Sequence, residues 1–360
     1  MKIVFIVNDL LAQRCVKRIR EFIEHGYEVE VYGYYRTEFE FPHLDDVKLN
    51  IIGEFDNTIS YASRLKIMYN SIRGIVDQYK DGVVYYLFQL DVALAFRACL
   101  RSYKYIYEES DMSHTYISNR LIRSILERLN KKVITDSLLT VFTSEGFLKY
   151  HFGNKTIPNA EIVTNRLATS ILHIEGHEKI KHEKLRIGFV GALRYNSTLN
   201  FIDVFCRNFP DYEFHIFGSL SNSYSDKIDE LRKYENCIFH GRFKNPDDLP
   251  KIYSKIDMVL STYDAEHENV RYAEPNKLYE AIYFETPIIV SKNTFLSEKV
   301  EKLGVGYSID ALNDIEIVSF IKHDYKKNYD DKINSCKKID KNSCLNINDR
   351  LFSRLKDLLK

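Results

Sequence analysis

The first half of the chain alternates short apolar runs with segments in which apolar residues recur every three or four positions. Runs rich in Val, Ile, Phe and Tyr predict buried strands, and the intervening periodicity predicts helices. The predicted strands are residues 2–7, 27–32, 83–87, 103–107 and 138–143, and the predicted helices are residues 14–25, 61–79, 92–100, 121–131 and 145–150. Strands that alternate with helices in this order predict a doubly wound parallel sheet.

The second half repeats the same pattern. Predicted strands are residues 185–190, 212–217, 238–240, 258–260 and 288–290, and predicted helices are residues 201–208, 224–234, 249–254, 295–302 and a segment that holds Glu280. We therefore expect two Rossmann-like domains, residues 1–167 and 185–312, facing one another across a cleft. A polar linker with three histidines is expected over residues 168–184, and a Lys-rich helical tail over residues 313–360.

Composition narrows the classes of partner. The 51 Lys and Arg residues equal the 51 Asp and Glu residues in number, so net charge gives no reason to expect nucleic acid as a partner. The six cysteines are scattered without paired spacing, which argues against a zinc site and a disulfide framework and favours a cytoplasmic setting. No apolar run is long enough to span a membrane, and the N-terminus is too quickly polar for a signal peptide.

The segment after residue 272 carries the most specific chemistry. The polar or helix-breaking residues Glu274, Pro275 and Asn276 precede a helical apolar pattern that begins at residue 278. A helix N-terminus can bind phosphate through free N–H groups and the positive end of its dipole. A carboxylate one turn further on, at Glu280, can accept two hydrogen bonds from a ribose diol. The alternative is a surface helix on which Lys277 and Glu280 form an exposed pair.

This segment resembles the nucleotide-sugar signature of GT-B glycosyltransferases. These are mostly retaining enzymes with a Glu-x7-Glu motif, found in bacterial capsule, exopolysaccharide and O-antigen synthesis. The matching residues are Pro275, Lys277, Glu280 and Ala281, which fit the Pro-x-Lys-x-x-Glu-Ala variant, and Thr286-Pro287, which fits the turn after it. The resemblance implies that Glu280 holds the ribose. Because Tyr272 stands where the family has its first glutamate, contact with the donor sugar falls to Glu274 or Arg271.

The resemblance also implies further donor residues. Arg194, just beyond the strand 185–190, would grip the pyrophosphate, because a guanidinium makes two parallel hydrogen bonds to a phosphate. Gly218 would let the backbone approach the nucleotide closely. Phe243 would stack on the base. The alternatives are an ordinary solvated arginine at Arg194 and a simply packed ring at Phe243.

In the first domain, an acidic segment follows the strand 103–107 and resembles the family's Glu-x-x-Asp segment. Its residues run from Glu108 to His114. Ionisable groups at the carboxyl end of a strand lower stability unless they are solvated or take part in binding or catalysis. Asp111 and His114 are the candidates for handling the acceptor hydroxyl. The alternative is a solvated acidic loop.

The stretch 120–132 holds five Lys or Arg residues and an apolar stripe formed by Leu121, Ile122, Ile125 and Leu129. Such a helix can lie on an anionic membrane, which would suit a lipid-linked acceptor. In the alternative interpretation, the apolar stripe packs inward on the core and the basic face is simply solvated. In GT-B proteins the last helix often crosses back onto the first domain, and the tail 313–360 is long enough to do so.

These features together predict a glycosyltransferase of the hexosyltransferase class, acting in surface polysaccharide synthesis. It would move a sugar from a nucleotide-diphosphate donor to a hydroxyl of a glycan or lipid-linked glycan, with retention of configuration. Arg194, Lys277 and the helix end near Asn276 would stabilise the leaving diphosphate without a metal or cofactor. Asp111 or His114 could instead serve as the base of an inverting reaction. A sugar-nucleotide epimerase and a non-catalytic partner subunit of the same fold are the rival functions. We expect a cytoplasmic protein, at the inner face of the membrane if it contacts lipid.

Overall fold

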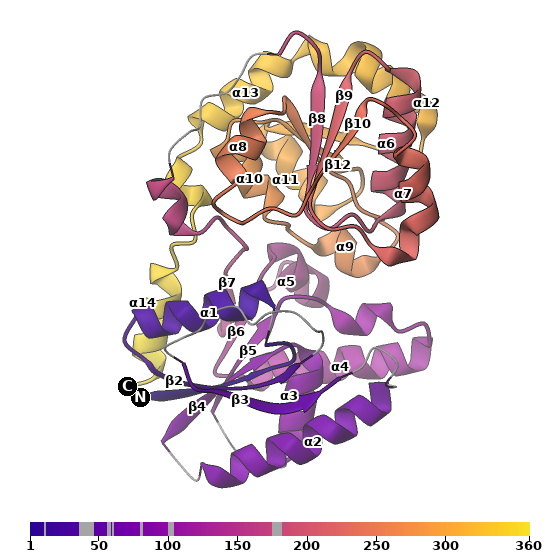
Figure 1. Cartoon of the computed structure of the whole chain (residues 1–360). Coiled ribbons are helices and arrows are strands. Elements are labelled where there is room, and N and C mark those ends of the chain that lie inside the picture. Colours follow the sequence, from indigo (N-terminus) through magenta and orange to yellow (C-terminus); the bar gives the residue numbers. More distant parts are fainter. Residues whose placement is uncertain are drawn as a thin grey trace. The chain divides into compact units, whose positions relative to one another are not determined.

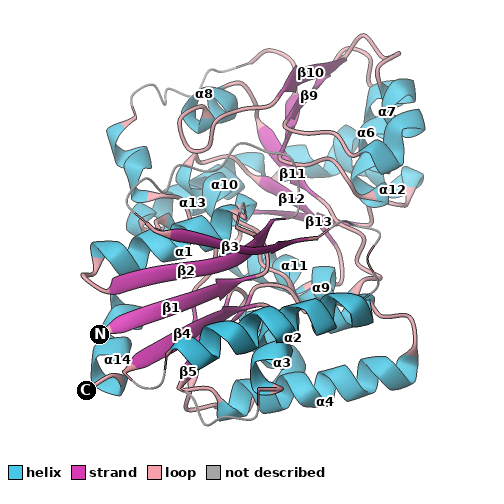
Figure 2. Ribbon diagram, turned by 60° about the horizontal axis from the view of Figure 1, so that its bottom comes forward, coloured by secondary structure: helices cyan, strands magenta, loops and turns pink. Residues whose placement is uncertain are grey.

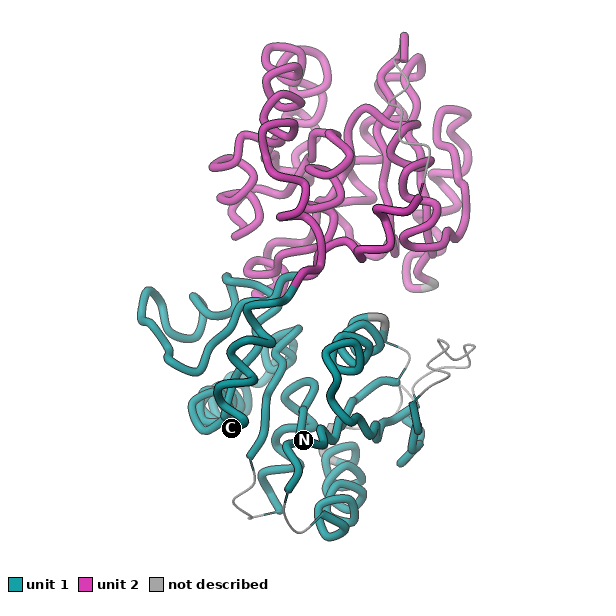
Figure 3. The backbone as a smooth tube through the Cα atoms, turned by 90° about the vertical axis from the view of Figure 1, so that its left-hand side faces the viewer, with its two compact units in different colours: residues 1–164, 348–360 teal, residues 165–347 magenta. Residues whose placement is uncertain are grey.

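The computed structural model describes residues 1–10, 12–35, 47–55, 59, 61–79, 82–99, 104–174 and 182–360. The chain divides into two compact units (Figure 1, Figure 3). Unit 1 comprises Met1–Thr164 and Asn348–Lys360, and unit 2 comprises Asn165–Ile347. No helix in these described ranges is long and apolar enough to cross a membrane.

Unit 1 is built on a seven-stranded parallel sheet with the order β3-β2-β1-β4-β5-β6-β7. Its strands are β1 (Lys2–Val7), β2 (Glu28–Tyr35), β3 (Leu49–Glu54), β4 (Val83–Phe88), β5 (Tyr105–Glu109), β6 (Leu139–Phe142) and β7 (Ala160–Ile162). The central strand β1 is buried on both faces from Ile3 onward, as expected where helices cover both sides of a parallel sheet.

Helices cover both faces of this sheet (Figure 1, Figure 2). They are α1 (Gln13–Glu24), α2 (Tyr61–Gln78), α3 (Leu90–Arg97), α4 (Arg120–Asp136), α5 (Glu145–Phe152) and the C-terminal α14 (Asp349–Leu358). Apolar residues of α1 and α14 join one core cluster with β1, in which Phe22 packs edge-on against Phe5 and Phe352. The opposite face of the sheet carries α2, α3 and α4.

Unit 2 repeats this architecture with a six-stranded parallel sheet of order β10-β9-β8-β11-β12-β13. Its strands are β8 (Arg186–Val190), β9 (Glu213–Phe217), β10 (Cys237–Gly241), β11 (Met258–Ser261), β12 (Ile288–Ser291) and β13 (Gly306–Ile309). Its helices are α6 (Asn196–Asn208), α7 (Ser225–Leu231), α8 (Leu249–Ser254), α9 (Glu268–Tyr272), α10 (Lys277–Tyr283), α11 (Phe295–Leu303), α12 (Asp314–Ser319) and α13 (Tyr329–Lys338). Core residues place α6, α7 and α12 on one face and α8, α10 and α11 on the other.

The predicted fold class, two doubly wound parallel α/β domains, is confirmed. All predicted strands are present, and β3, β7, β13, α9 and α13 are additional elements. In the expected linker, Thr169–His173 forms a short 3-10 helix within unit 2, and residues 175–181 lie outside the described residues. The expected tail is divided, since residues 313–347 belong to unit 2 and residues 348–360 to unit 1.

Candidate functional site

The strand order of unit 2 reverses between β8 and β11. From β8 the chain continues to β9 on one side, and from β11 it continues to β12 on the other. The carboxyl ends of these two strands lead into loops that begin at Gly191 and Thr262. In open α/β sheets, ligands bind outside the carboxyl ends of the strands at such a reversal. The fold therefore locates a binding site for unit 2 at this point.

The ammonium group of Lys277 lies at this reversal. Its Nζ donates a hydrogen bond to Tyr263 Oη at 3.0 Å and lies 4.9 Å from the centroid of the Phe189 ring. A Cβ atom on Gly191 would be 3.2 Å from the same Nζ. Lys277 is only 8% exposed and forms no salt bridge within the described residues. The charge of Lys277 acts on the nearby carboxyl group of Glu280 and opposes the rise of its pKa, but no carboxylate in the described part of the chain is in direct contact with the ammonium. A buried cation without a direct ion pair is costly, so this position favours an anionic ligand.

Two glycines bring the neighbouring loops into direct main-chain contact. A Cβ atom on Gly218 would lie 1.9 Å from the carbonyl oxygen of Gly191, which is a prohibitive clash. Gly191 N donates to Phe217 O at 2.8 Å, and Gly218 N donates to Gly241 O at 2.7 Å. Both glycines have a φ of 134°, which side-chain-bearing residues rarely adopt. Beside Lys277, the surface at the strand ends is therefore bare backbone.

Glu280 lies on α10, one turn after Lys277, and is 3% exposed. Its Oε2 accepts a hydrogen bond from Tyr253 Oη at 2.8 Å, and its Oε1 accepts one from Asn276 Nδ2 at 3.0 Å. Burial raises the pKa of this carboxyl group above its ordinary value. The alternative of an exposed Lys277–Glu280 pair on a surface helix is wrong, because both side chains are buried.

Glu274 precedes α10 and is also buried. Its Oε1 accepts hydrogen bonds from Tyr279 Oη and from Lys299 Nζ, the latter at 2.5 Å. Its Oε2 is buried without a hydrogen-bond partner. Buried carboxylate oxygens in folded proteins normally accept a hydrogen bond, so this atom can accept one from an additional donor. Tyr279 and Lys299 hold Glu274 in place. Their roles have no recognisable signal in the sequence, because they depend on tertiary contact.

The remaining predicted donor residues differ in exposure. Arg194 is exposed, with its guanidinium 5.4 Å from the centroid of the Tyr195 ring. Arg271 is exposed, and its Nε donates to Ala265 O at 3.1 Å. Pro275 is half-buried at the entry to α10. Phe243 is half-buried and packs against the core of unit 2, as its alternative interpretation expected.

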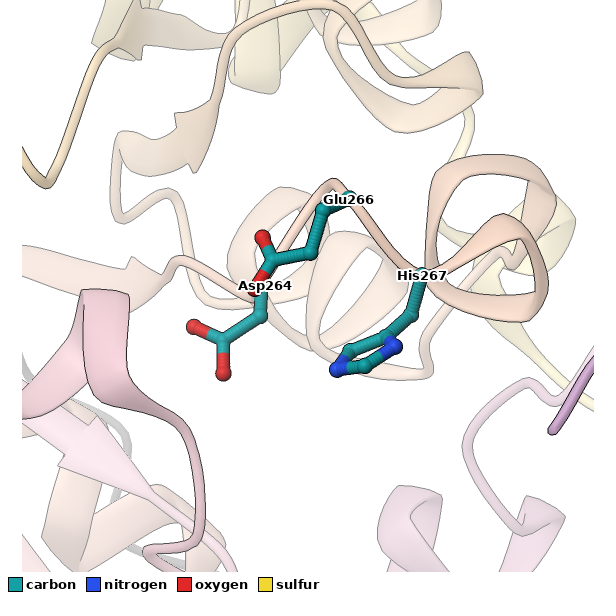
Figure 4. A group of neighbouring side chains, drawn as sticks. All are labelled: Asp264, Glu266 and His267. Atoms are coloured by element: carbon teal, nitrogen blue, oxygen red, sulfur yellow. The ribbon is translucent and has the colours of Figure 1, made fainter. Parts of the chain in front are cut away.

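Asp264, Glu266 and His267 form a group that the sequence did not single out (Figure 4). Their ligand atoms lie within 4.8 Å of one another. Both carboxylate oxygens of Asp264 already accept main-chain hydrogen bonds from the start of α6, from Ser197 N at 2.7 Å and Asn196 N at 3.1 Å. Asp264 therefore holds the helix that follows Arg194, a role that no local sequence pattern signals across this distance.

The acceptor candidates belong to unit 1. Asp111 Oδ2 accepts hydrogen bonds from Arg14 Nη1 at 3.1 Å and from Gln89 Nε2 at 3.4 Å, and the side chain is 42% exposed. His114 is 1% exposed, and neither ring nitrogen has a hydrogen-bond partner. Burial lowers the pKa of His114 to about 4, so its imidazole is neutral at pH 7.

Glu108 and Glu109 lie inside unit 1 and are held by internal partners. Glu108 Oε2 accepts hydrogen bonds from Arg18 Nε at 2.9 Å and from Tyr86 Oη. Glu109 is paired with His151, whose Nε2 lies 2.8 Å from Oε2. The alternative of a solvated acidic loop is therefore wrong for these two glutamates.

Known proteins resemble this chain in sequence and in fold. Residues 173–343 match the family described as Glycosyl transferases group 1. The chain is 21% identical over 342 residues to the succinoglycan biosynthesis protein ExoL of Rhizobium meliloti, covering 89% of this chain and 84% of that protein.

Solved structures share the fold. The lipopolysaccharide outer core galactosyltransferase WaaB aligns with a TM-score of 0.66 at 13% identity, over 100% of this chain and 99% of that one. Anabaena HepE in complex with UDP and glucose aligns with a TM-score of 0.66 at 14% identity, over 99% of both chains. The chain therefore has the GT-B fold, matches the family of glycosyl transferases group 1 over residues 173–343, and is a glycosyltransferase.

Proposed function

We propose that this glycosyltransferase moves a sugar from a nucleotide-diphosphate donor to a hydroxyl of a glycan or lipid-linked glycan in surface polysaccharide synthesis. The observation that carries the proposal is the buried ammonium of Lys277 at the carboxyl ends of β8 and β11, without a salt-bridge partner within the described residues. A diphosphate supplies the negative charge that this position lacks.

The leaving group is the chemical difficulty of the reaction. When the bond between the sugar and the diphosphate breaks, negative charge accumulates on the phosphate oxygens. Lys277 and Arg194 stabilise that charge, and preorganised cations are most effective where water is excluded. Gly191 leaves the backbone bare beside the ammonium of Lys277, and Gly218 permits the close main-chain contact that holds Gly191 there. We propose that no resident metal or cofactor takes part.

Glu280 binds the ribose of the donor, and Glu274 binds the sugar that is transferred. An ionised carboxylate has about four acceptor positions, and each oxygen of Glu280 uses one of them, with Tyr253 or Asn276. The hydroxyls of the ribose fill others. The unpartnered Oε2 of Glu274 accepts a hydrogen bond from a hydroxyl of the transferred sugar. Arg271 and Asn276 are exposed and belong to the same binding surface.

The acceptor side is assigned to Asp111 and His114. We propose that configuration is retained and that the departing phosphate accepts the proton of the incoming hydroxyl. An inverting reaction would need a protein base, for which the partly exposed carboxylate of Asp111 is the better candidate, because a pKa of about 4 makes the buried imidazole of His114 a weak base at pH 7. The role of ExoL in succinoglycan biosynthesis, and the UDP and glucose bound to HepE, support a sugar-nucleotide donor and a polysaccharide product. We place the reaction in the cytoplasm.

The test is a thermal shift assay with UDP, GDP, CDP, dTDP and ADP in buffer without divalent metal. The proteins are wild type, Lys277→Ala, Glu280→Gln and the control Lys233→Ala, which removes an exposed lysine paired with Glu230. A nucleotide at 100 times its Kd stabilises the folded state by about 2.7 kcal/mol, or roughly 5–10 °C for a domain of this size.

We expect one diphosphate to raise the melting temperature of wild type and Lys233→Ala. The increase should be largely lost in Lys277→Ala and reduced in Glu280→Gln, which keeps the shape of the carboxyl group. If no nucleotide shifts wild type, or if Lys277→Ala responds as wild type does, the donor site is wrongly assigned. Incubation with the matching sugar nucleotide alone then separates a transferase from an epimerase by its products.

A further inference from the structure

Helix α4 has two apolar faces, and only one of them packs against unit 1. The helix begins at Asn119, whose side chain accepts hydrogen bonds from Leu121 N and Ile122 N at 3.0 and 3.1 Å. The inward face is completed by the buried residues Leu126, Asn130, Val133 and Ile134. This face alone secures the helix on the sheet, so the rest of its apolar surface has another explanation.

The outward face carries four large aliphatic side chains in contact with solvent. Leu121 is 78% exposed, Ile122 49%, Ile125 55% and Leu129 41%. Ile125 is four positions after Leu121, three after Ile122 and four before Leu129, which places all four on one side of the helix. Tyr116, in the turn that precedes the helix, is 55% exposed. The interpretation in which this stripe packs inward on the core is therefore wrong. Contiguous exposed apolar surface of this kind marks an interaction site.

Cations surround this stripe. Arg120, Arg128 and Lys132 are exposed, and none of them forms an ion pair within the part of the chain that the structure describes. Glu127 is the single acidic residue between positions 120 and 132, and it is neutralised by Lys131 at 3.0 Å. By helical geometry Arg128 and Lys132 lie on the same side as Leu121, Ile125 and Leu129. The surface is thus both apolar and positively charged.

We propose that this face of α4 docks on a lipid surface with anionic headgroups. The aliphatic side chains enter the boundary between headgroups and acyl chains, while the long basic side chains reach the phosphates. The helix lies in the plane of the membrane, because its inward face is already packed against unit 1 and only the outward face is available to lipid. A second copy of the chain is disfavoured as occupant, since two such faces would bring unpaired cations together.

This inference stands on α4 alone and does not depend on the donor site in unit 2. It nevertheless gives a place for a lipid-linked acceptor. An enzyme held at the surface by α4 meets such an acceptor at the membrane rather than in bulk solution.

The test is flotation of the full chain with vesicles of phosphatidylcholine, with or without phosphatidylglycerol. Leu121→Ser combined with Ile125→Ser removes two exposed side chains of the stripe. The matched control is Leu312→Ser combined with Ile315→Ser, which removes exposed aliphatic residues of unit 2, 54% and 82% exposed. Both double variants should keep the melting temperature of wild type.

We expect wild type and the control to float with phosphatidylglycerol vesicles and to bind phosphatidylcholine far less. The stripe variant should bind at least about tenfold more weakly, because each aliphatic side chain loses a transfer free energy above 1.4 kcal/mol. Arg128→Gln and Lys132→Gln should each weaken binding roughly fivefold, and added salt should weaken it further.

Three outcomes would overturn the proposal. Wild type could fail to float with either vesicle, or it could bind neutral and anionic vesicles equally. The stripe variant could also bind as wild type does. If wild type elutes as a dimer that the stripe variant converts to monomer, without vesicle binding, the occupant is a second copy of the chain. The stripe variant should still show the nucleotide-dependent thermal shift of wild type. A loss of vesicle binding can then be distinguished from a failure of the donor site.

Discussion

Individual residues at the carboxyl end of the unit 2 sheet are constrained by close approach and by buried charge. The main chains of Gly191 and Gly218 are in direct contact, and the side chain of Lys277 lies next to Gly191. The sequence identified Gly218 and Lys277 as candidates. It did not identify Tyr263, which orients the ammonium, or Tyr253, which donates to Glu280. Tyr263 comes from the loop after β11 and Tyr253 from α8, so their roles depend on chain segments that meet only in the folded protein.

Gly218→Ala should destabilise unit 2 and impair the donor site. The new Cβ would need to displace the carbonyl oxygen of Gly191, which lies 1.9 Å from its position. We expect a loss of about 2–4 kcal/mol in the unfolding free energy of unit 2, and a smaller nucleotide-dependent shift. The measurement is calorimetry with and without the diphosphate that stabilises wild type.

Gly241→Ala is the matched control for this substitution. Gly241 also has positive φ, at 78°, but an added Cβ would meet no atom within 4 Å. Its cost should be limited to backbone strain, about 1–2 kcal/mol. Equal melting temperatures for the two alanine variants would contradict this expectation. They would show that the backbone at Gly191 can move away from the new Cβ at little cost in stability.

His114 should make unit 1 less stable in mild acid. Burial lowers its pKa in the folded protein to about 4, against an ordinary value of 6.5, although the nearby Glu109 opposes the shift. Between these values the unfolded chain binds a proton that the folded chain does not. The contribution of His114 to stability is therefore complete above pH 6.5 and falls by roughly 1.4 kcal/mol per unit as pH decreases toward 4.

His114→Leu removes that titration together with two unpartnered buried nitrogens. We expect the variant to be at least as stable as wild type at pH 7, because replacing an unsatisfied polar group by an apolar one is often favourable. Its advantage should grow between pH 6.5 and 4.5 in thermal unfolding curves. A variant that is less stable throughout this range would indicate that the imidazole has a stabilising partner. If the variant is stable but its transferase activity is lost, His114 is used in the reaction.

Among the strands, those inside the two sheets were predicted, whereas three of the four edge strands were missed and β10 was the one edge strand predicted. Strands β1, β4, β8 and β12 are continuous apolar runs because helices cover both faces of the sheets. The three missed strands lie at sheet edges. In β3 only partly buried and exposed positions occur, β7 has three residues, and β13 begins at Gly306. Pairing with a neighbouring strand defines such segments, and one sequence does not reveal the neighbour.

Helix α6 is held at its N-terminus by Asp264, a residue from the loop after β11. Asp264→Ala removes acceptors for the N–H groups of Asn196 and Ser197. We expect unit 2 to lose about 1–2 kcal/mol, as for the loss of other helix caps. Because Arg194 is attached to this helix start, the nucleotide-dependent thermal shift should also decrease.

Glu266→Ala serves as the control, since Glu266 is an exposed neighbour in the same group (Figure 4). It should leave both the melting temperature and the nucleotide response unchanged, with or without EDTA. A rise in melting temperature on addition of Mg²⁺ or Mn²⁺, abolished by Glu266→Ala, would instead indicate that Asp264, Glu266 and His267 bind a cation.

At the scale of the whole molecule, the chain returns to unit 1 at its C-terminal end. Helix α14 buries Leu351, Phe352 and Leu355 in the core of unit 1. Phe352 stacks on His25 with ring centroids 3.5 Å apart. Arg354 Nη1 pairs with Glu161 at 3.0 Å. Unit 1 is therefore completed by residues that lie at the other end of the sequence.

Phe352→Ala should destabilise unit 1 selectively. Truncation of a phenylalanine that is 2% exposed typically costs about 3–5 kcal/mol. Calorimetry should show a lowered transition for unit 1, while the transition that responds to nucleotide stays in place. Lys356→Ala, an exposed substitution on the same helix, should change neither transition. A decrease in the nucleotide-responsive transition with Phe352→Ala would mean that the two units unfold as one.

The sequence by itself determined the class of the fold and the segment that carries the donor chemistry. Continuous apolar runs and helical spacing depend on residues close together in the chain, and so does the motif from Pro275 to Ala281. Only the tertiary structure decided which charges are buried and which apolar faces are covered. Lys277 and Glu280 could form a surface pair or an interior site, and the stripe on α4 could face the core or solvent. Local spacing is the same in each case, because burial depends on the distant segments that pack against a residue.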